Sequence, residues 1–333
     1  MKKTLLIAYN ERKHYIPLDL GYVKAYCDNS PEIRLISRKD NIFICGRRLA
    51  DYDYVFFFLD HIIHSDYFPL RYALRLFSII RRYNGKTKLC IQSHKIDEDH
   101  SKRILLENKQ VNCIVRGEPE ITISKILEGR ELINIDGLSY RDTKINVNPD
   151  RELLDDLDVI PSPYVSGALD KGFYLNSKTG MVLTSRGCIF DCYYCFRSNK
   201  YKRIRYFSIE RIVEELKCLR DNGVQRVRFV DDCFISNQKR FENLVEAITK
   251  ENLGLRFQLM CRVEFLTKMN INLLKKLDTY DVQIGLQTVN KENLIRLHRK
   301  FDPESFGLVI LYHEKSACFD KQGSSNEHHM RIL

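Results

Sequence analysis

Short apolar strands alternate with amphipathic helices along most of the chain, and this alternation limits the folds open to it. Strands and helices in such a series form a mostly parallel sheet with helices on both faces. In the first part of the chain the clearest helical stripe covers 70–83. The strand candidates there are 5–9, 33–36, 54–59, 88–92 and 111–115. We expect a Rossmann-like domain over 1–150 that ends in a small hairpin within 131–150.

A second series of strands and helices follows residues 151–175, where acidic residues and a Pro-Ser-Pro turn are typical of a linker. Ser208 is a predicted N-cap for a helix that Gly223 ends. The strand candidates are 182–184, 227–230, 255–259 and 282–286. Four consecutive βα units predict a partial β/α (TIM-like) barrel over 176–333, which would carry its site at the C-terminal ends of the strands.

Composition excludes several classes of protein. No run of eighteen apolar residues is present, which predicts that nothing spans a membrane. The apolar run after Lys3 is too short for a signal peptide, so we expect a cytoplasmic protein. Eleven cysteines without a secretion signal argue against a disulfide framework. The net charge of +10 fits a dispersed solvated surface better than a nucleic-acid partner, since the one dense basic run is 200–205.

Three cysteines lie within eight residues, directly after the first strand of the second series. Cys188, Cys192 and Cys195 form a CxxxCxxC pattern inside one predicted loop. Thiolates this close in sequence can converge on one metal centre. Iron–sulfur clusters usually take four cysteines, and three would leave one iron open. Zinc is the competing interpretation, but structural zinc sites use four Cys or His ligands, and no partner pair is evident beyond His328-His329.

The pattern CxxxCxφC, with the aromatic Tyr194 at φ, resembles the signature of the radical S-adenosylmethionine (SAM) superfamily. The resemblance implies a [4Fe–4S] cluster on Cys188, Cys192 and Cys195 whose open iron chelates SAM. It implies reductive cleavage of SAM to a 5′-deoxyadenosyl radical that acts on a small-molecule substrate. It also implies an electron donor such as flavodoxin or ferredoxin.

Later segments extend this resemblance and imply contacts to SAM. Asp231 and Asp232 stand in a second-strand motif that approaches the SAM amino group, where carboxylates suit an ammonium. Arg262 ends the third strand, where the family often places Arg. Gln287 belongs to a fourth-strand motif near the ribose, and Tyr194 would lie close to the adenine. For the aspartates, a helix N-terminal acidic cap is the alternative interpretation.

The N-terminal half resembles the subfamily whose members carry a cobalamin-binding domain. The matching segments are 16–22, 115–120, 137–141 and 157–163. Many such relatives are methyltransferases and others catalyse ring closures or rearrangements. The resemblance therefore implies a cobalamin-dependent methyltransferase or a related radical transformation of a small molecule.

Two departures from the subfamily pattern leave alternatives open. Relatives usually have a Gly-Gly turn where this chain has Gln92–Lys95, and the DxHxxG motif is absent, so the sequence leaves cobalamin binding open. The family's partial barrel has six βα units, whereas four are predicted here and the tail to Leu333 lacks strand periodicity. An apparently incomplete C-terminus is therefore expected. The alternatives are a radical SAM enzyme of RNA modification and a truncated, non-catalytic iron–sulfur or zinc protein.

Overall fold

The computed structural model describes residues 2–10, 16–28, 30–60, 68–195, 201, 203–299, 301 and 329–332. The chain divides into two compact units, each described here by itself. The first unit is Met1–Leu154 with Val159–Phe173, and the second is Asp155–Asp158 with Tyr174–Leu333. Within the described ranges, every helix is too short or too polar to cross a membrane.

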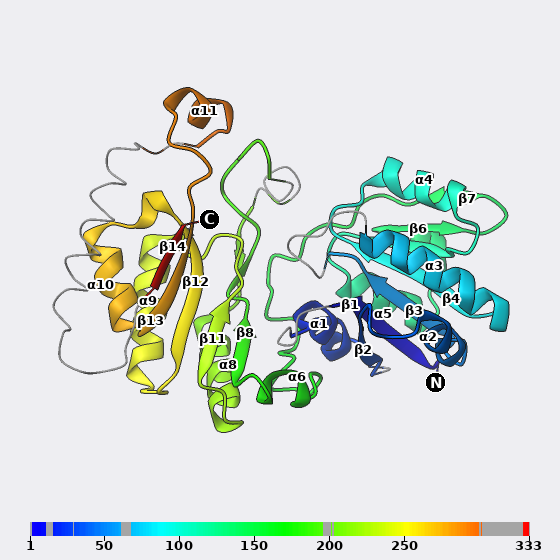
Figure 1. Ribbon diagram of the computed structural model, residues 1–333, viewed down its shortest axis with the longest axis horizontal. Coiled ribbons are helices and arrows are strands. Elements are labelled where there is room, and N and C mark those ends of the chain that lie inside the picture. Colours follow the sequence, from blue (N-terminus) through cyan, green and yellow to red (C-terminus); the bar gives the residue numbers. More distant parts are fainter. Residues whose placement is uncertain are drawn as a thin grey trace. The chain divides into compact units, whose positions relative to one another are not determined.

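The first unit is built on a seven-stranded sheet in the order β2-β1-β3-β4-β5-β6-β7 (Figure 1). The strands are β1 (Thr4–Tyr9), β2 (Glu32–Ile36), β3 (Tyr54–Phe58), β4 (Lys88–Ser93), β5 (Cys113–Arg116), β6 (Leu138–Arg141) and β7 (Ile145–Val147). Strands β1 to β5 are parallel, and the β6–β7 hairpin continues the sheet antiparallel. The order 2-1-3 places a topological switch point between β1 and β3, where sheets of this type bind ligands.

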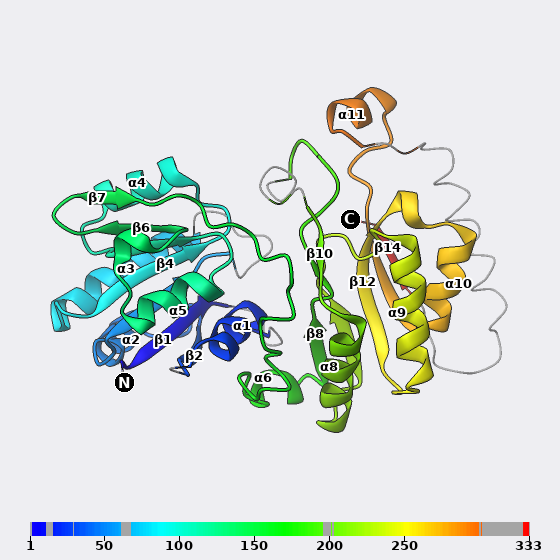
Figure 2. The same cartoon turned by 180° about the vertical axis from the view of Figure 1, so that it is seen from behind.

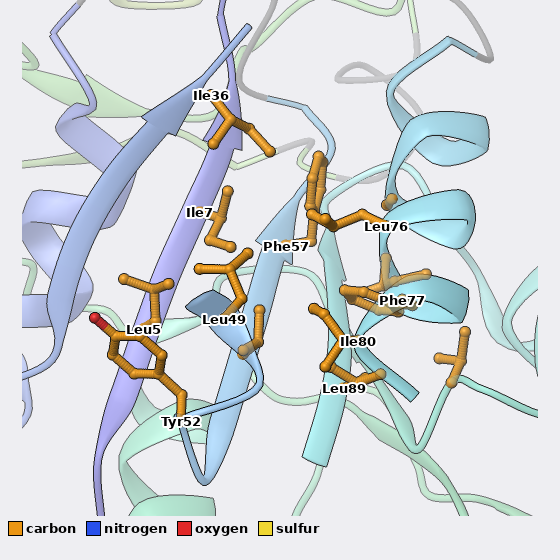
Figure 3. Packing of buried hydrophobic residues seen from close by; sticks show 14 of the residues in the cluster. Leu5, Ile7, Ile36, Leu49, Tyr52, Phe57, Leu76, Phe77, Ile80 and Leu89 are labelled. Carbon is orange, nitrogen blue, oxygen red and sulfur yellow. The ribbon is translucent and has the colours of Figure 1, made fainter. Parts of the chain in front are cut away.

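Helices cover both faces of this sheet and bury two separate cores. The helices are α1 (Leu18–Tyr26), α2 (Ile42–Leu49), α3 (Phe68–Tyr83), α4 (Glu98–Glu107), α5 (Glu120–Glu128) and the 3-10 turn η1 (Leu132–Asn134). One core joins the sheet to α2 and α3 and includes Ile7, Phe57 and Phe77 (Figure 3). The rings of Phe57 and Phe77 meet edge to face. The other core joins the opposite face to α1 and α5.

The second unit has a five-stranded sheet in the order β14-β13-β12-β11-β8, and all its pairs are parallel. Its strands are β8 (Thr179–Val182), β11 (Arg226–Phe229), β12 (Arg256–Arg262), β13 (Thr279–Gly285) and β14 (His329–Ile332). A separate antiparallel pair joins β9 (Ser185–Arg186) to β10 (Arg205–Tyr206). The expected α/β class, Rossmann-like followed by a partial TIM-like barrel, is confirmed.

The helices of this unit follow its strands in turn, and Figure 2 shows α8, α9 and α10 together in front of the curved sheet. They are α8 (Ile209–Asp221), α9 (Gln238–Lys250), α10 (Lys268–Lys276), α11 (Lys291–Arg296) and the turn η2 (Val263–Phe265), while the short α6 (Gly172–Leu175) spans the division between the two units. Ser208 caps α8, since its Oγ accepts the backbone N–H of Arg211, and Gly223 follows the helix with φ +82°. Both predictions for this helix are confirmed.

A further strand, β14, follows the four predicted βα units, in the tail where the sequence shows no strand periodicity. Strand β14 pairs with β13 in parallel register, with Asp281 opposite His329 and Ile284 opposite Ile332. Four residues with polar neighbours are too few to produce a strand periodicity in the sequence. Residues 302–328, which join β14 to the rest of the sheet, lie outside the described residues.

Candidate active site

The cysteine loop begins at the carboxyl edge of the second sheet, and Gly187 allows it to close. Gly187 has φ +93°, and a Cβ on it would lie 2.2 Å from the backbone oxygen of Arg203. The amide of Cys188 donates to the carbonyl of Tyr201 at 3.2 Å. The two ends of the loop therefore approach so closely at this point that only glycine fits. Residues 196–200 and 202 lie outside the described part of the loop.

Cys192 is the buried member of the trio, at 7% exposure, and it is held by the end of β12. Arg262 donates from Nη1 to the Cys192 sulfur at 3.0 Å, while its Nε donates to Glu264 at 3.0 Å. The guanidinium also lies 3.6 Å from the ring centroid of Phe190. Arg262 therefore links the Cys192 sulfur to Glu264 and to the ring of Phe190.

Cys188 and Cys195 occupy half-buried positions on either side of Cys192. A hydrogen bond from Cys233 lowers the pKa of Cys188 to about 7, against the opposing effect of burial, and the amide of Phe190 lowers it further. The amide of Cys195 donates to the carbonyl of Cys192 at 3.0 Å, which forms a tight turn between the last two cysteines. The chemistry of these donors suits a metal centre that takes thiolates.

The three sulfur atoms are not gathered around one centre. Among the described residues, no three His, Cys, Asp or Glu side chains are grouped closely enough to hold a metal ion. The loop therefore supplies the donor set, and cluster binding would have to draw the three sulfur atoms together.

Asp231 and Asp232 follow β11, but the structure gives them different environments. Asp231 is buried, and its Oδ1 accepts from the Thr184 amide at 3.0 Å, the Thr184 hydroxyl at 2.7 Å and the Ser185 hydroxyl at 2.6 Å. Its Oδ2 is buried with no hydrogen-bond partner among the described residues. Burial raises the pKa of Asp231 to about 6 although these hydrogen bonds oppose the rise. Asp232 is exposed.

Tyr194 and Gln287 lie at the rim of the site. Tyr194 is 49% exposed, and burial of the rest of its ring raises the pKa of its phenol. Gln287 is exposed and has φ +62°, a left-handed conformation that is uncommon outside glycine. A Cβ on Gly285 would lie 2.9 Å from the Gln287 Nε2, so this side chain folds back over the end of β13.

Three further residues at this edge were not predicted from the sequence. Arg299 is 5% exposed and donates to the Gly285 carbonyl at 2.5 Å, and it lies 3.9 Å from Glu264. His298 has its Nδ1 3.2 Å from the carbonyl of Asp191. Cys233 is hydrogen-bonded to Cys188. These contacts join segments far apart in the chain, and no local pattern indicates them.

Comparison with known proteins shows which proteins this chain is similar to. Residues 182–309 match the sequence profile of the Radical SAM superfamily. The uncharacterized methyltransferase PH0819 of Pyrococcus horikoshii is 32% identical over 202 residues, which are 58% of this chain and 44% of that protein. The chain thus spans less than half the length of this curated relative.

Two solved structures share the fold of the chain. The radical SAM methyltransferase TsrM from Kitasatospora setae, with cobalamin and a [4Fe–4S] cluster bound, superposes with a TM-score of 0.74 at 16% identity. The superposition covers 100% of this chain and 66% of TsrM. The cobalamin-dependent SAM radical enzyme OxsB gives a TM-score of 0.71 at 18% identity over 92% of this chain and 47% of OxsB. At these identities the likeness establishes the fold.

The segment that matches the superfamily contains the cysteine loop, Asp231, Arg262 and Gln287. The structure places these residues at the same edge of one parallel sheet. Residues 182–309 therefore carry a domain of the radical SAM superfamily.

Proposed function

We propose that the chain is an enzyme that cleaves SAM reductively, with a [4Fe–4S] cluster held by Cys188, Cys192 and Cys195. The observation that carries this proposal is the closed cysteine loop at the carboxyl edge of a parallel sheet, with Arg262 hydrogen-bonded to Cys192. A bound cluster supplies the electron that breaks a carbon–sulfur bond of SAM. An electron donor such as flavodoxin or ferredoxin would reduce it.

The residues of this chain hold and orient SAM in the proposed reaction. Asp231 presents a buried oxygen, Oδ2, that lacks a partner among the described residues and suits an ammonium group. Arg262 fixes the position of Cys192 and the end of β12. Asp232, Tyr194 and Gln287 are exposed at the same edge, where they can contact the remaining parts of SAM.

We further propose methyl transfer to a small-molecule substrate, with the first unit as a cobalamin-binding-type domain. The methyltransferase name of the Pyrococcus relative and the fold shared with TsrM and OxsB support this. At the edge of the first sheet, Asp60 accepts hydrogen bonds from the Ser93 hydroxyl and from the amides of His94 and Lys95. This carboxylate stabilises the turn where relatives have Gly-Gly. The case for cobalamin rests on the fold.

The alternative functions gain no support from the described residues. In the basic run 200–205, Arg205 is buried at 4% exposure and Arg203 pairs with Asp155 at 2.5 Å. An RNA-binding face would need these charges exposed and clustered.

The proposed function is tested by SAM cleavage under anaerobic reducing conditions. The protein reconstituted with iron and sulfide should convert SAM to equal amounts of 5′-deoxyadenosine and methionine when dithionite is added. The matched control is Cys45→Ala, which removes a half-buried thiol from α2 in the first unit and should leave the yield unchanged. A fully loaded cluster that yields no 5′-deoxyadenosine would contradict the proposal.

Asp231→Asn should have two measurable effects, one on the pH dependence of stability and one on the affinity for SAM. The pKa of Asp231 is raised from 3.8 to about 6 in the folded protein, so the folded state binds the proton more tightly than the unfolded state. The stabilisation that comes from protonating the Asp231 carboxyl is therefore present below about pH 4 and is lost as the pH rises through 6. The variant should lack this pH dependence in denaturant unfolding, whereas Asp232→Asn should keep it. If Oδ2 binds the SAM ammonium, Asp231→Asn should also weaken SAM binding about 10- to 100-fold.

A further inference from the structure

The residues that follow α11 meet the cysteine loop on both sides of Cys192. The amide of Tyr193 donates to the carbonyl of Leu297 at 3.3 Å. The Nδ1 atom of His298 lies 3.2 Å from the carbonyl oxygen of Asp191 and 3.3 Å from its Oδ2. The residue before Cys192 and the residue after it are therefore each held by the same short segment.

The direction of the His298 contact follows from the chemistry of its partners. A carbonyl oxygen and a carboxylate oxygen accept hydrogen bonds, so Nδ1 carries a proton and donates it to Asp191. The His298 ring also stands at 60° to the ring of Tyr193, with 6.4 Å between the two centroids. Asp191 and Tyr193 are both exposed, so burial does little to hold this part of the loop.

The contacting segment is itself anchored in the second sheet. Arg299 is 5% exposed and donates to the carbonyl of Gly285, at the end of β13, at 2.5 Å. Its amide donates to the carbonyl of Leu294, the buried residue of α11, at 2.8 Å. Glu264 lies 3.9 Å from Arg299 and accepts from Arg262 at 3.0 Å. The backbone that contacts the loop is thus fixed to the ends of β12 and β13.

His298 adopts a backbone conformation in which glycine is common at helix ends. Its φ is +54°, and it stands two residues beyond the last residue of α11. Glycine takes this left-handed conformation without steric cost, whereas a residue with a Cβ does not. The histidine therefore costs backbone energy that glycine would not, and it supplies the hydrogen bond to Asp191 that glycine could not.

We propose that residues 297–299 form a clasp that positions the cysteine loop around Cys192, with His298 as the positioning residue. The clasp holds both neighbours of Cys192 and thereby makes local opening of the loop rarer. A loop that opens less often should also release a bound cluster more slowly. The inference rests on the proposed function in this last respect, because it takes Cys192 to be a cluster ligand.

Hydrogen exchange in the protein without a cluster tests the clasp directly. His298→Gly removes the donor and relieves the left-handed backbone, so the fold should be kept while the Tyr193 amide exchanges about two- to tenfold faster. His298→Asn keeps an N–H donor on a residue that tolerates this conformation, and it should restore slow exchange. The amide of Cys188, which is bonded to Tyr201 at the other end of the loop, should be unaffected by either substitution.

Asn252→Gly is the matched control for the change in backbone conformation. Asn252 also has a positive φ, +46°, and stands two residues beyond the last residue of α9. The substitution relieves the same kind of conformation outside the clasp and should leave exchange in the cysteine loop unchanged. A Tyr193 amide that exchanges at the wild-type rate in His298→Gly, or that is accelerated equally by Asn252→Gly, would overturn the inference.

Release of iron from the reconstituted protein to a chelator is the second readout. His298→Gly should lose its iron about two- to tenfold faster than the wild type, and His298→Asn should lose it at close to the wild-type rate. Equal rates for His298→Gly and the wild type would contradict the positioning role. A wild-type protein that binds no cluster would contradict the proposed function, while hydrogen exchange would still decide whether the clasp holds the loop.

Discussion

Replacement of Cys192 by Ala should abolish binding of the iron–sulfur cluster and reduce SAM cleavage to background. Cys192 is the most buried of the three loop cysteines and receives the hydrogen bond from Arg262. Its loss removes one of only three proposed ligands and leaves the Arg262 guanidinium facing an empty position. Iron and sulfide content after anaerobic reconstitution, with the visible absorbance of the cluster, would measure the effect.

Cys218→Ala is the control for this experiment, because Cys218 is half-buried in α8 and lies outside the loop. It should retain full iron content. A Cys192→Ala protein that binds the wild-type amount of iron and cleaves SAM would exclude Cys192 as a ligand.

Gly187→Ala should destabilise the second unit and prevent the loop from closing. The position has φ +93°, and the added methyl group would lie 2.2 Å from the Arg203 carbonyl oxygen. The backbone must shift to relieve this overlap, so we expect the free energy of unfolding to fall by about 3 kcal/mol or more. Iron content should fall with it, because Cys188 is the next residue.

Gly223→Ala is the control that distinguishes the steric overlap expected at Gly187 from the cost of a positive φ alone. Gly223 also has a positive φ, +82°, but a Cβ there would meet nothing within 4 Å. This substitution should lower the free energy of unfolding by only about 1 kcal/mol, and the protein should keep its cluster. Equal losses of stability for the two variants, measured by denaturant unfolding, would show that the loop does not close at Gly187 as described.

Much of the fold could be predicted because the strands and helices carry their own periodicity. The five parallel strands of the first unit lie where the apolar runs indicated, and Ser208 caps the expected helix. Strand β14 could not be predicted, since four residues carry too little pattern and its place depends on pairing with β13, more than forty positions earlier. Such a pairing is a property of the tertiary structure.

The part of the site formed by a short sequence motif could be predicted. The part formed by contacts between residues far apart in the sequence could not. The spacing of the cysteines indicates a metal centre by itself. By contrast, Asp231 and Asp232 are identical neighbours in sequence, and only the hydrogen bonds to Thr184 and Ser185 distinguish the buried carboxylate from the exposed one. The contact between Arg262 and Cys192 joins residues seventy positions apart, which sequence spacing cannot reveal.

The most direct test of the central claim is the EPR spectrum of the anaerobically reconstituted, reduced protein recorded with and without SAM. We expect a [4Fe–4S]⁺ signal that changes when SAM is added, because three cysteine ligands leave one iron open to it. A reduced cluster whose spectrum is the same with and without SAM, or a protein that binds zinc and no cluster, would contradict the claim.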